Sequence, residues 1–441
     1  MSAVVESTSV YLQDFRSRSV DEPAWLAERR EAGIQAFEAL GLPHRRMEAW
    51  RNLKLGLLGQ EHFAAADALG AVPMALAPTA ALVPEAWRLV FVDGHLSPGH
   101  AAVDALPKGV TVRPLREALA QDAELLETHL GRHVELDAHP FAALNSAFWA
   151  DGALIDVAPG TVLDAPVVLV FLSSESSAHR ASYPRVLVRA GESAEFRIAQ
   201  IHAGPDNLPY FVAPVTEIVA EANSSVQLHH VQEEGDSAYH LGLVHADLAR
   251  DARLHLHGFN DGGKVGRTDI YVNLAGEGAD ARLDGLYLVG DGQYADYHTW
   301  VRHQSGHCTS QQLFKGVLSG KAESVFDGLI HVHKGAQKTD SQQQNRNLLL
   351  SPRALTHSNP RLEIYADDVK CAHGSTVGEL DRDALFYLRS RGVGENDARG
   401  LLTFAFANEM LQPIGIEALR DHVGQRLAAF MPGDATVKEL L

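Results

Sequence analysis

The residues with the most distinctive chemistry are a cysteine and a histidine in Val369-Lys370-Cys371-Ala372-His373-Gly374. Residues i and i+2 of an extended strand face the same side, so Cys371 and His373 would lie side by side. A thiolate is the form of cysteine that binds metals, and Lys370 and His373 are placed to favour it. The pattern predicts either a metal-ligating pair or, alternatively, a partly buried thiol beside a surface histidine at a strand end.

The cysteine count limits what this pair can hold. The chain has only two cysteines, Cys308 and Cys371, which excludes a disulfide framework and a self-contained four-cysteine site. An iron–sulfur cluster usually takes four protein ligands. A cluster at Cys371 would therefore need ligands from a partner chain, from histidines or carboxylates, or from small thiols. Cys308 is predicted to be a small buried hydrophobic residue.

Other histidines have spacings that suit metal binding less well. His255 and His257, like His331 and His333, are two residues apart, and His303 and His307 lie close to Cys308. No carboxylate accompanies them at a fixed ligand spacing, so we interpret them as ordinary strand residues. The sequence also lacks the G-x-x-x-x-G-K-[ST] phosphate loop and a nucleophile elbow. We therefore expect no enzymatic activity from the chain alone, and any energy input must come from another protein.

Two long stretches resemble a known family. They are Leu362-Glu363-Ile364-Tyr365-Ala366-Asp367-Asp368-Val369-Lys370-Cys371-Ala372-His373-Gly374 and Ala384-Leu385-Phe386-Tyr387-Leu388-Arg389-Ser390-Arg391-Gly392. Both resemble the SufB/SufD family of the Suf iron–sulfur cluster assembly machinery, and the sequence around Cys371 is more similar to the SufD branch.

The resemblance implies a scaffold subunit of a SufBCD complex, paired with a SufB-like paralogue and driven by the SufC ATPase. It makes His373 and Cys371 candidate ligands of a transient cluster at the interface between subunits. It also allows a reduced flavin on the whole complex, with no cofactor firmly bound by this chain alone. The candidate ATPase-docking residues are Phe386, Tyr387, Leu388, Arg389, Arg391 and Gly392.

Two alternative functions stay open at this stage. One is a SufB-like scaffold that works as a homo-oligomer, with the chain forming a homodimer when alone. The other is a β-helix enzyme acting on carbohydrate, which would need a groove lined with several acidic residues and a turnover of its own.

The composition limits the kinds of binding partner and the cellular compartment that we expect for this protein. The 441 residues include 38 basic and 56 acidic side chains, for a net charge of −18. This balance disfavours nucleic acid and anionic membranes as partners. Without an N-terminal export signal or a long apolar run, the expected location is the cytoplasm.

Periodicity divides the chain into three regions. Residues 1–150 are mostly helical with a short strand from Arg88 to Val92, residues 151–378 alternate like strands, and residues 379–441 are helical again. Turn residues Gly191, Asn223, Asp251 and Asp280 recur every 28 to 32 residues in the middle region. Such a repeat without helices is typical of stacked coils, so we predict a mainly β fold, a right-handed parallel β-helix between helical ends.

The tail should contain three helices. Asp381 is placed to cap the first, which Gly392 would end, and Asn396 is placed to cap the second. Because a stacked sheet with an open end invites edge pairing, we expect these helices to cover that end of the β-helix. The family resemblance implies that the same surface also forms the ATPase dock.

Overall fold

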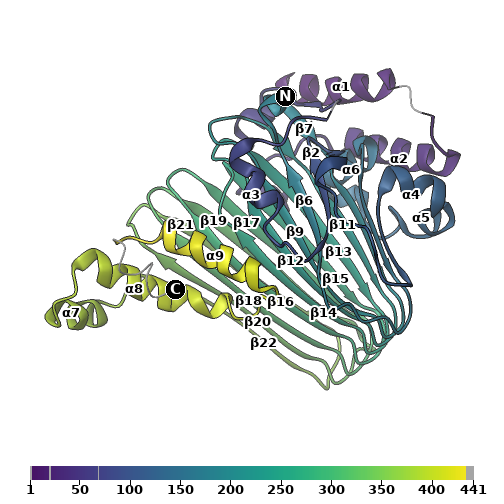
Figure 1. Ribbon diagram of the computed structural model, residues 1–441. Coiled ribbons are helices and arrows are strands. Elements are labelled where there is room, and N and C mark those ends of the chain that lie inside the picture. The colour runs from purple at the N-terminus through teal and green to yellow at the C-terminus, as the bar shows by residue number, and fades with distance from the viewer. Residues whose placement is uncertain (1, 19–20, 68, 434–441) are drawn as a thin grey trace.

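The computed structural model describes residues 2–18, 21–67 and 69–433, so the last part of the predicted C-terminal region, 434–441, lies outside the described residues. Two long, mostly parallel sheets face each other across one core, and helices flank them (Figure 1). The predicted parallel β-helix is therefore confirmed. None of the described helices is long and apolar enough to cross a bilayer.

The chain alternates between the two sheets, so each coil contributes one strand to each. In spatial order, the first sheet contains β21 (Leu355–Ile364), β19 (Glu323–Val332), β17 (Tyr294–His303), β15 (Val265–Leu274), β13 (Tyr239–Leu248), β11 (Val215–Ala220), β8 (Arg185–Ala190), β5 (Gly152–Val157) and β4 (Val110–Pro114). The second contains β22 (Lys370–Gly378), β20 (Asp340–Leu349), β18 (Thr309–Leu318), β16 (Asp280–Val289), β14 (Arg253–Asn260), β12 (Ser225–Glu233), β9 (Glu195–Ala203), β6 (Val167–Leu172), β2 (Trp87–Val92) and β3 (His95–Leu96). Short strands β1 (Ala64–Ala65), β7 (Arg180–Ser182) and β10 (Phe211–Val212) pair beside the first sheet.

Six successive turns from the first sheet to the second, those after β8, β11, β13, β15, β17 and β19, each place one residue in the left-handed region. These residues are Ser193, Asn223, Asp251, Gly278, His307 and Lys338. Asn223 and Asp251, which the sequence predicted as turn residues, are among them. Gly191 lies in the same turn as Ser193, as predicted, whereas Asp280 is the first residue of β16 and not a turn residue. Alternation in the strands determines which side chains point inward, but it does not determine which residue makes the turn. Ser and Lys also adopt the left-handed conformation in these turns.

Helices of the N-terminal region pack on the outer face of the first sheet. Apart from the short helix α3 (Ala77–Ala80), whose Ala80 packs with Val170 of the second sheet, they are α1 (Ser2–Ser17), α2 (Ala24–Leu40), α4 (Leu115–Gln121), α5 (Ala123–His129) and α6 (Pro140–Phe148). Phe37 and Leu144 share a buried cluster with Leu187 and Leu241 of the sheet. Strands β2 and β4 extend both sheets from within residues 1–150, so this region shares its core with the β-helix.

Two of the C-terminal helices, α8 (Glu395–Ala407) and α9 (Glu417–Phe430), lie along the second sheet, in yellow-green and yellow in Figure 1. The helix α7 (Arg382–Ser390) projects away from the sheets and has no buried residue. Leu419 and Val423 of α9 pack with Val231 and Phe259 on the outer face of that sheet. The expectation that the tail covers the end of the β-helix is wrong, because β22 stays largely exposed.

The helix boundaries follow local sequence signals only in part. Asp381 caps α7 as predicted, since its Oδ1 accepts the backbone N–H groups of Asp383 and Ala384 at 2.8 and 3.0 Å. The predicted cap at Asn396 is wrong, because α8 already begins at Glu395 after Gly394.

A buried ion pair connects the N-terminal helices to the β-helix. Arg185 of β8 binds the carboxylate of Glu217 on β11, and both side chains are at most 1% exposed. The same guanidinium donates to Asn145 of α6 at 3.1 Å, while the N–H of Gly131 donates to Glu217 at 2.8 Å. Burial opposes the charge of Glu217, but Arg185 and this amide keep its pKa below the ordinary value.

Removing one partner of this pair should destabilise the whole chain. Glu217→Ala leaves Arg185 buried and unpaired, and we expect it to lower the free energy of unfolding by about 3–5 kcal/mol in urea titrations. The matched control is the exposed Glu192→Ala, which should change it by no more than about 0.5 kcal/mol. Equal effects from the two substitutions would contradict this account.

Candidate functional site

The β-helix ends in two strands whose outer edges lack a partner among the described residues. β21 bonds to β19 and β22 bonds to β20, and each is the terminal strand of its sheet. A free edge presents a row of unpaired backbone N–H and C=O groups. Leu355, Tyr365 and Val377 are exposed large apolar side chains on or beside these strands. We call this region, residues 355–378, the open end.

The inward columns of side chains change character as they approach the open end. Leu256 and Leu283 belong to the apolar core, and the next residues in register on the following coils are Gln312, Gln343 and His373. Gln343 is fully buried, yet neither its amide oxygen nor its amide nitrogen has a hydrogen-bond partner. His373 therefore continues a polar column and sits at its exposed end.

Cys371 occupies the neighbouring column on the same face of β22. Its partner in register is Ser341, which in turn pairs with Ser310, and the two serine hydroxyls are 2.6 Å apart. A cavity of about 280 Å³ beside these columns is lined by Gln343 and His373 among others. The structure thus places both predicted ligands on one strand face at the open end.

Cys371 is half-buried, and its thiol is the favoured form in the isolated chain. Burial raises the pKa of Cys371, and the nearby charge of Asp340 raises it further. The expectation that Lys370 or His373 would favour the thiolate is therefore wrong for this state of the protein. Binding of a metal would have to displace the thiol proton.

The remaining cysteine and the histidine pairs have structural partners. Cys308 is fully buried in the apolar core, as predicted. His255 Nε2 lies 2.9 Å from Asp284, and His257 Nε2 lies 2.7 Å from the carbonyl oxygen of Met410. His331 and His333 contact each other edge to face, with ring centroids 4.5 Å apart.

One buried group of three possible metal ligands was missed by sequence reasoning. It consists of His202, Glu234 and His240, and no other group of this kind occurs in the described part of the chain. The residues lie on different strands and a turn, so no sequence spacing connects them. Cys371 and His373 do not belong to such a preformed group.

The helix α7 presents an apolar surface to solvent. None of its residues is buried, and Phe386 and Tyr387 are 74% and 56% exposed. The guanidinium of Arg391 lies 5.2 Å from the centre of the Tyr387 ring, and Arg389 lies 3.5 Å from Glu395. Leu388 is half-buried, and Gly392, at φ = 88°, follows the end of the helix as predicted.

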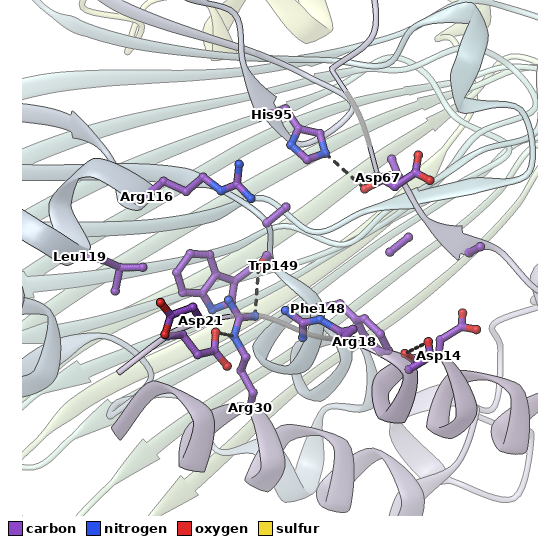
Figure 2. Close-up of a pocket in the computed structure, with 16 residues that line it drawn as sticks. Asp14, Arg18, Asp21, Arg30, Asp67, His95, Arg116, Leu119, Phe148 and Trp149 are labelled. Atoms are coloured by element: carbon purple, nitrogen blue, oxygen red, sulfur yellow. Dashed lines mark hydrogen bonds and ion pairs between the residues drawn. The ribbon is translucent and has the colours of Figure 1, made fainter. Parts of the chain in front are cut away.

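The largest cavities lie away from the open end or hold paired charges. The first, about 840 Å³, is formed by the N-terminal region, where Arg30 contacts Glu22 at 2.8 Å and the carbonyl of Trp149 at 3.0 Å (Figure 2). Another cavity, of about 530 Å³, includes Asp296 and Asp327. Arg267 and Arg361 pair with these two carboxylates, so they do not form the free acidic pair that glycoside hydrolysis requires.

Comparison with known proteins supports the resemblance seen in the sequence. Residues 6–169 match the family model of the SufBD protein N-terminal region, and residues 171–406 match that of the SufBD core domain of the SUF system for FeS cluster assembly. The chain is 32% identical to an iron–sulfur cluster assembly SufBD family protein of Synechocystis sp., over 92% of this chain and 91% of that protein. It is 32% identical to the assembly protein SufD of Escherichia coli, over 91% and 92%, and 25% identical to SufD of Bacillus subtilis, over 93% and 94%.

The two cysteines should differ sharply in reactivity. We expect a maleimide to label Cys371 in the native chain and to leave Cys308 unmodified, so Cys371→Ser should abolish labelling and Cys308→Ser should not. Because the Cys371 pKa is raised, its labelling rate should still be rising with pH at pH 9, which stopped-flow fluorescence measures. A rate that is already constant at pH 7 would show that the thiolate is favoured after all.

Proposed function

The chain belongs to the SufBD family of iron–sulfur cluster assembly proteins, and from this premise we propose that it is a SufD-like scaffold subunit of a SufBCD complex. In this role it pairs with a SufB-like chain, a SufC-type ATPase drives the complex, and clusters are built at the subunit interface in the cytoplasm. The supporting observation is the open end, where free strand edges, exposed apolar groups and the pair Cys371 and His373 occur together.

The open end has the properties of an interface with another β-helix. Its two free edges offer backbone hydrogen bonds, and an incoming pair of strands of similar spacing would satisfy them and continue both sheets. Pairing would also bury Leu355 and Val377, which removes apolar surface from water. A SufB-like paralogue is the natural occupant, since a related β-helix would present matching edges.

The ligand set at this end is incomplete without a partner. Cys371 and His373 supply one sulfur and one nitrogen donor, whereas iron–sulfur clusters usually take four ligands. In the proposed complex the partner supplies the rest, so the cluster is a transient cargo shared by both chains. Docking would exclude water from the site, and release of the cluster would require the interface to open.

Helix α7 is the proposed dock for the ATPase. Aromatic side chains such as Phe386 and Tyr387 are typical anchors of protein interfaces, and here both are largely exposed. Since the sequence has no phosphate-binding loop, the energy for opening the interface must arrive through such a dock. A reduced flavin would belong to the assembled complex.

A homodimer of this chain is the second candidate, because the unpaired N–H and C=O groups of the free strand edges could also pair with those of a second copy. It predicts that the isolated chain dimerises tightly and holds iron without a paralogue. Light-scattering chromatography of the chain alone and with SufB-like and SufC-like partners distinguishes the two assemblies.

His373→Ala should reduce cluster formation without preventing assembly. The substitution removes a nitrogen ligand from an exposed position, so the fold and the strand pairing should persist. We expect the iron and sulfide content of the anaerobically purified complex to fall about tenfold, in line with the loss of a metal-binding group. Circular dichroism and co-elution of the subunits should be unchanged.

The matched control for this experiment is His100→Ala, an exposed histidine beside the first strands of the β-helix. It should leave iron and sulfide content at the level of the unaltered complex. A normal cluster yield from His373→Ala would remove the ligand assignment, even if the scaffold role were kept.

Phe386→Ala should weaken binding of the ATPase. An exposed aromatic anchor is worth about 2 kcal/mol or more in an interface, so the dissociation constant should rise roughly thirtyfold in calorimetric titrations. The control is Arg382→Ala, one turn earlier on α7 and largely exposed. If Phe386→Ala bound the ATPase as tightly as the control did, α7 would not be the dock.

A further inference from the structure

A second cluster of ligand-type residues lies inside the β-helix, apart from the open end. It joins His202 at the end of β9, Glu234 in the turn after β12, and His240 in β13. Their exposed fractions are 1%, 2% and 0%. One ligand atom from each residue lies within 4.8 Å of the other two.

The cluster contains more buried polar atoms than the protein satisfies. Both ring nitrogens of His202, Nε2 of His240 and Oε2 of Glu234 have no hydrogen-bond partner. The one internal bond joins His240 Nδ1 to Glu234 Oε1 at 2.7 Å. Such groups are normally paired in folded proteins, because leaving them unpaired costs free energy of folding.

The charge of Glu234 poses a related problem. Its carboxylate forms an ion pair with His240 and with no Lys or Arg of the described residues. A fully buried carboxylate requires a positive partner or a proton. A bound cation would supply that partner and would also accept the free nitrogen lone pairs.

We propose that His202, Glu234 and His240 bind one divalent transition metal ion of the Fe²⁺ or Zn²⁺ class. Two imidazoles and one carboxylate form a donor set that such ions favour over Mg²⁺ or Ca²⁺, which prefer oxygen ligands. The ring of His230 lies 5.0 Å from that of His202 and 5.5 Å from that of His240, and its Nδ1 is unpartnered. His230 is thus placed to serve as a fourth ligand.

The protonation of these rings agrees with metal binding. Burial lowers the pKa of His202 well below its ordinary value, and burial together with the neighbouring His240 lowers the pKa of His230 to about 3. At neutral pH both imidazoles are therefore uncharged, and each has a lone pair free for a metal ion.

The position of the site separates it from cluster assembly. It lies among β9, β12 and β13, whereas the open end is formed by β21 and β22, and all its ligands come from this chain. This inference does not rest on the proposed function. Because the site is enclosed, we expect the ion to load during folding and to exchange slowly, as a structural component of the coil.

The test is the metal content of the full-length chain expressed in Zn²⁺-supplemented medium and then dialysed against EDTA. We expect about one Zn²⁺ per chain by mass spectrometry, and a loss of tenfold or more in His202→Gln and in Glu234→Gln. The matched control is His303→Gln, since His303 is buried and bonded to Ser310 at 2.9 Å. It should keep the full content.

Retention of Zn²⁺ in both ligand variants, or no Zn²⁺ in the unaltered chain after dialysis, would overturn the proposal. If a ligand variant does not fold, X-ray absorption at the zinc edge of the unaltered chain decides. Imidazole and oxygen ligands support the site, whereas a sulfur ligand would place the ion at a cysteine and overturn it.

Discussion

The backbone hydrogen bonds between successive coils are the interaction on which the rest of this structure depends. In a parallel β-helix each strand forms hydrogen bonds with the coil before it and the coil after it. The chain itself therefore pairs the backbone N–H and C=O groups of every strand except those of a terminal coil. At the first coil, β2, β3 and β4 from the N-terminal region extend both sheets. At the last coil, β21 and β22 keep free edges among the described residues, and the candidate ligands lie there.

The side chains inside the coils follow the same order. The column that ends at His373 is aliphatic in the middle of the β-helix and becomes polar toward β22, where Gln312, Gln343 and His373 succeed one another. An aliphatic column stabilises stacking by burial, whereas a polar column is stable at an end that a partner covers or that water reaches. This change of character places the candidate ligand His373 at the polar end of an otherwise apolar column.

Much of this arrangement was predictable from the sequence because alternation and repeat length are local signals. Residues such as Val226, Leu228 and Leu254 fixed the phase of the inward face, and the family resemblance drew attention to Cys371 and His373. The site of His202, Glu234 and His240 was not predictable, since it depends on the register between coils. The position of the C-terminal helices was also not predicted. Leu419 and Val423 lie in a stretch whose sequence predicts a helix, but the sequence does not show that this helix packs on the second sheet.

The central claim is that the open end pairs with a second β-helix, and hydrogen exchange at β22 tests it most directly. Amides of residues 370–378 that do not bond to β20 should exchange rapidly in the chain alone, because their edge is free. On addition of the SufB-like chain, mass spectrometry should show that these amides become protected while those of β12 do not change. Unchanged exchange at β22 within a stable complex would contradict the account, because the partner would then bind elsewhere.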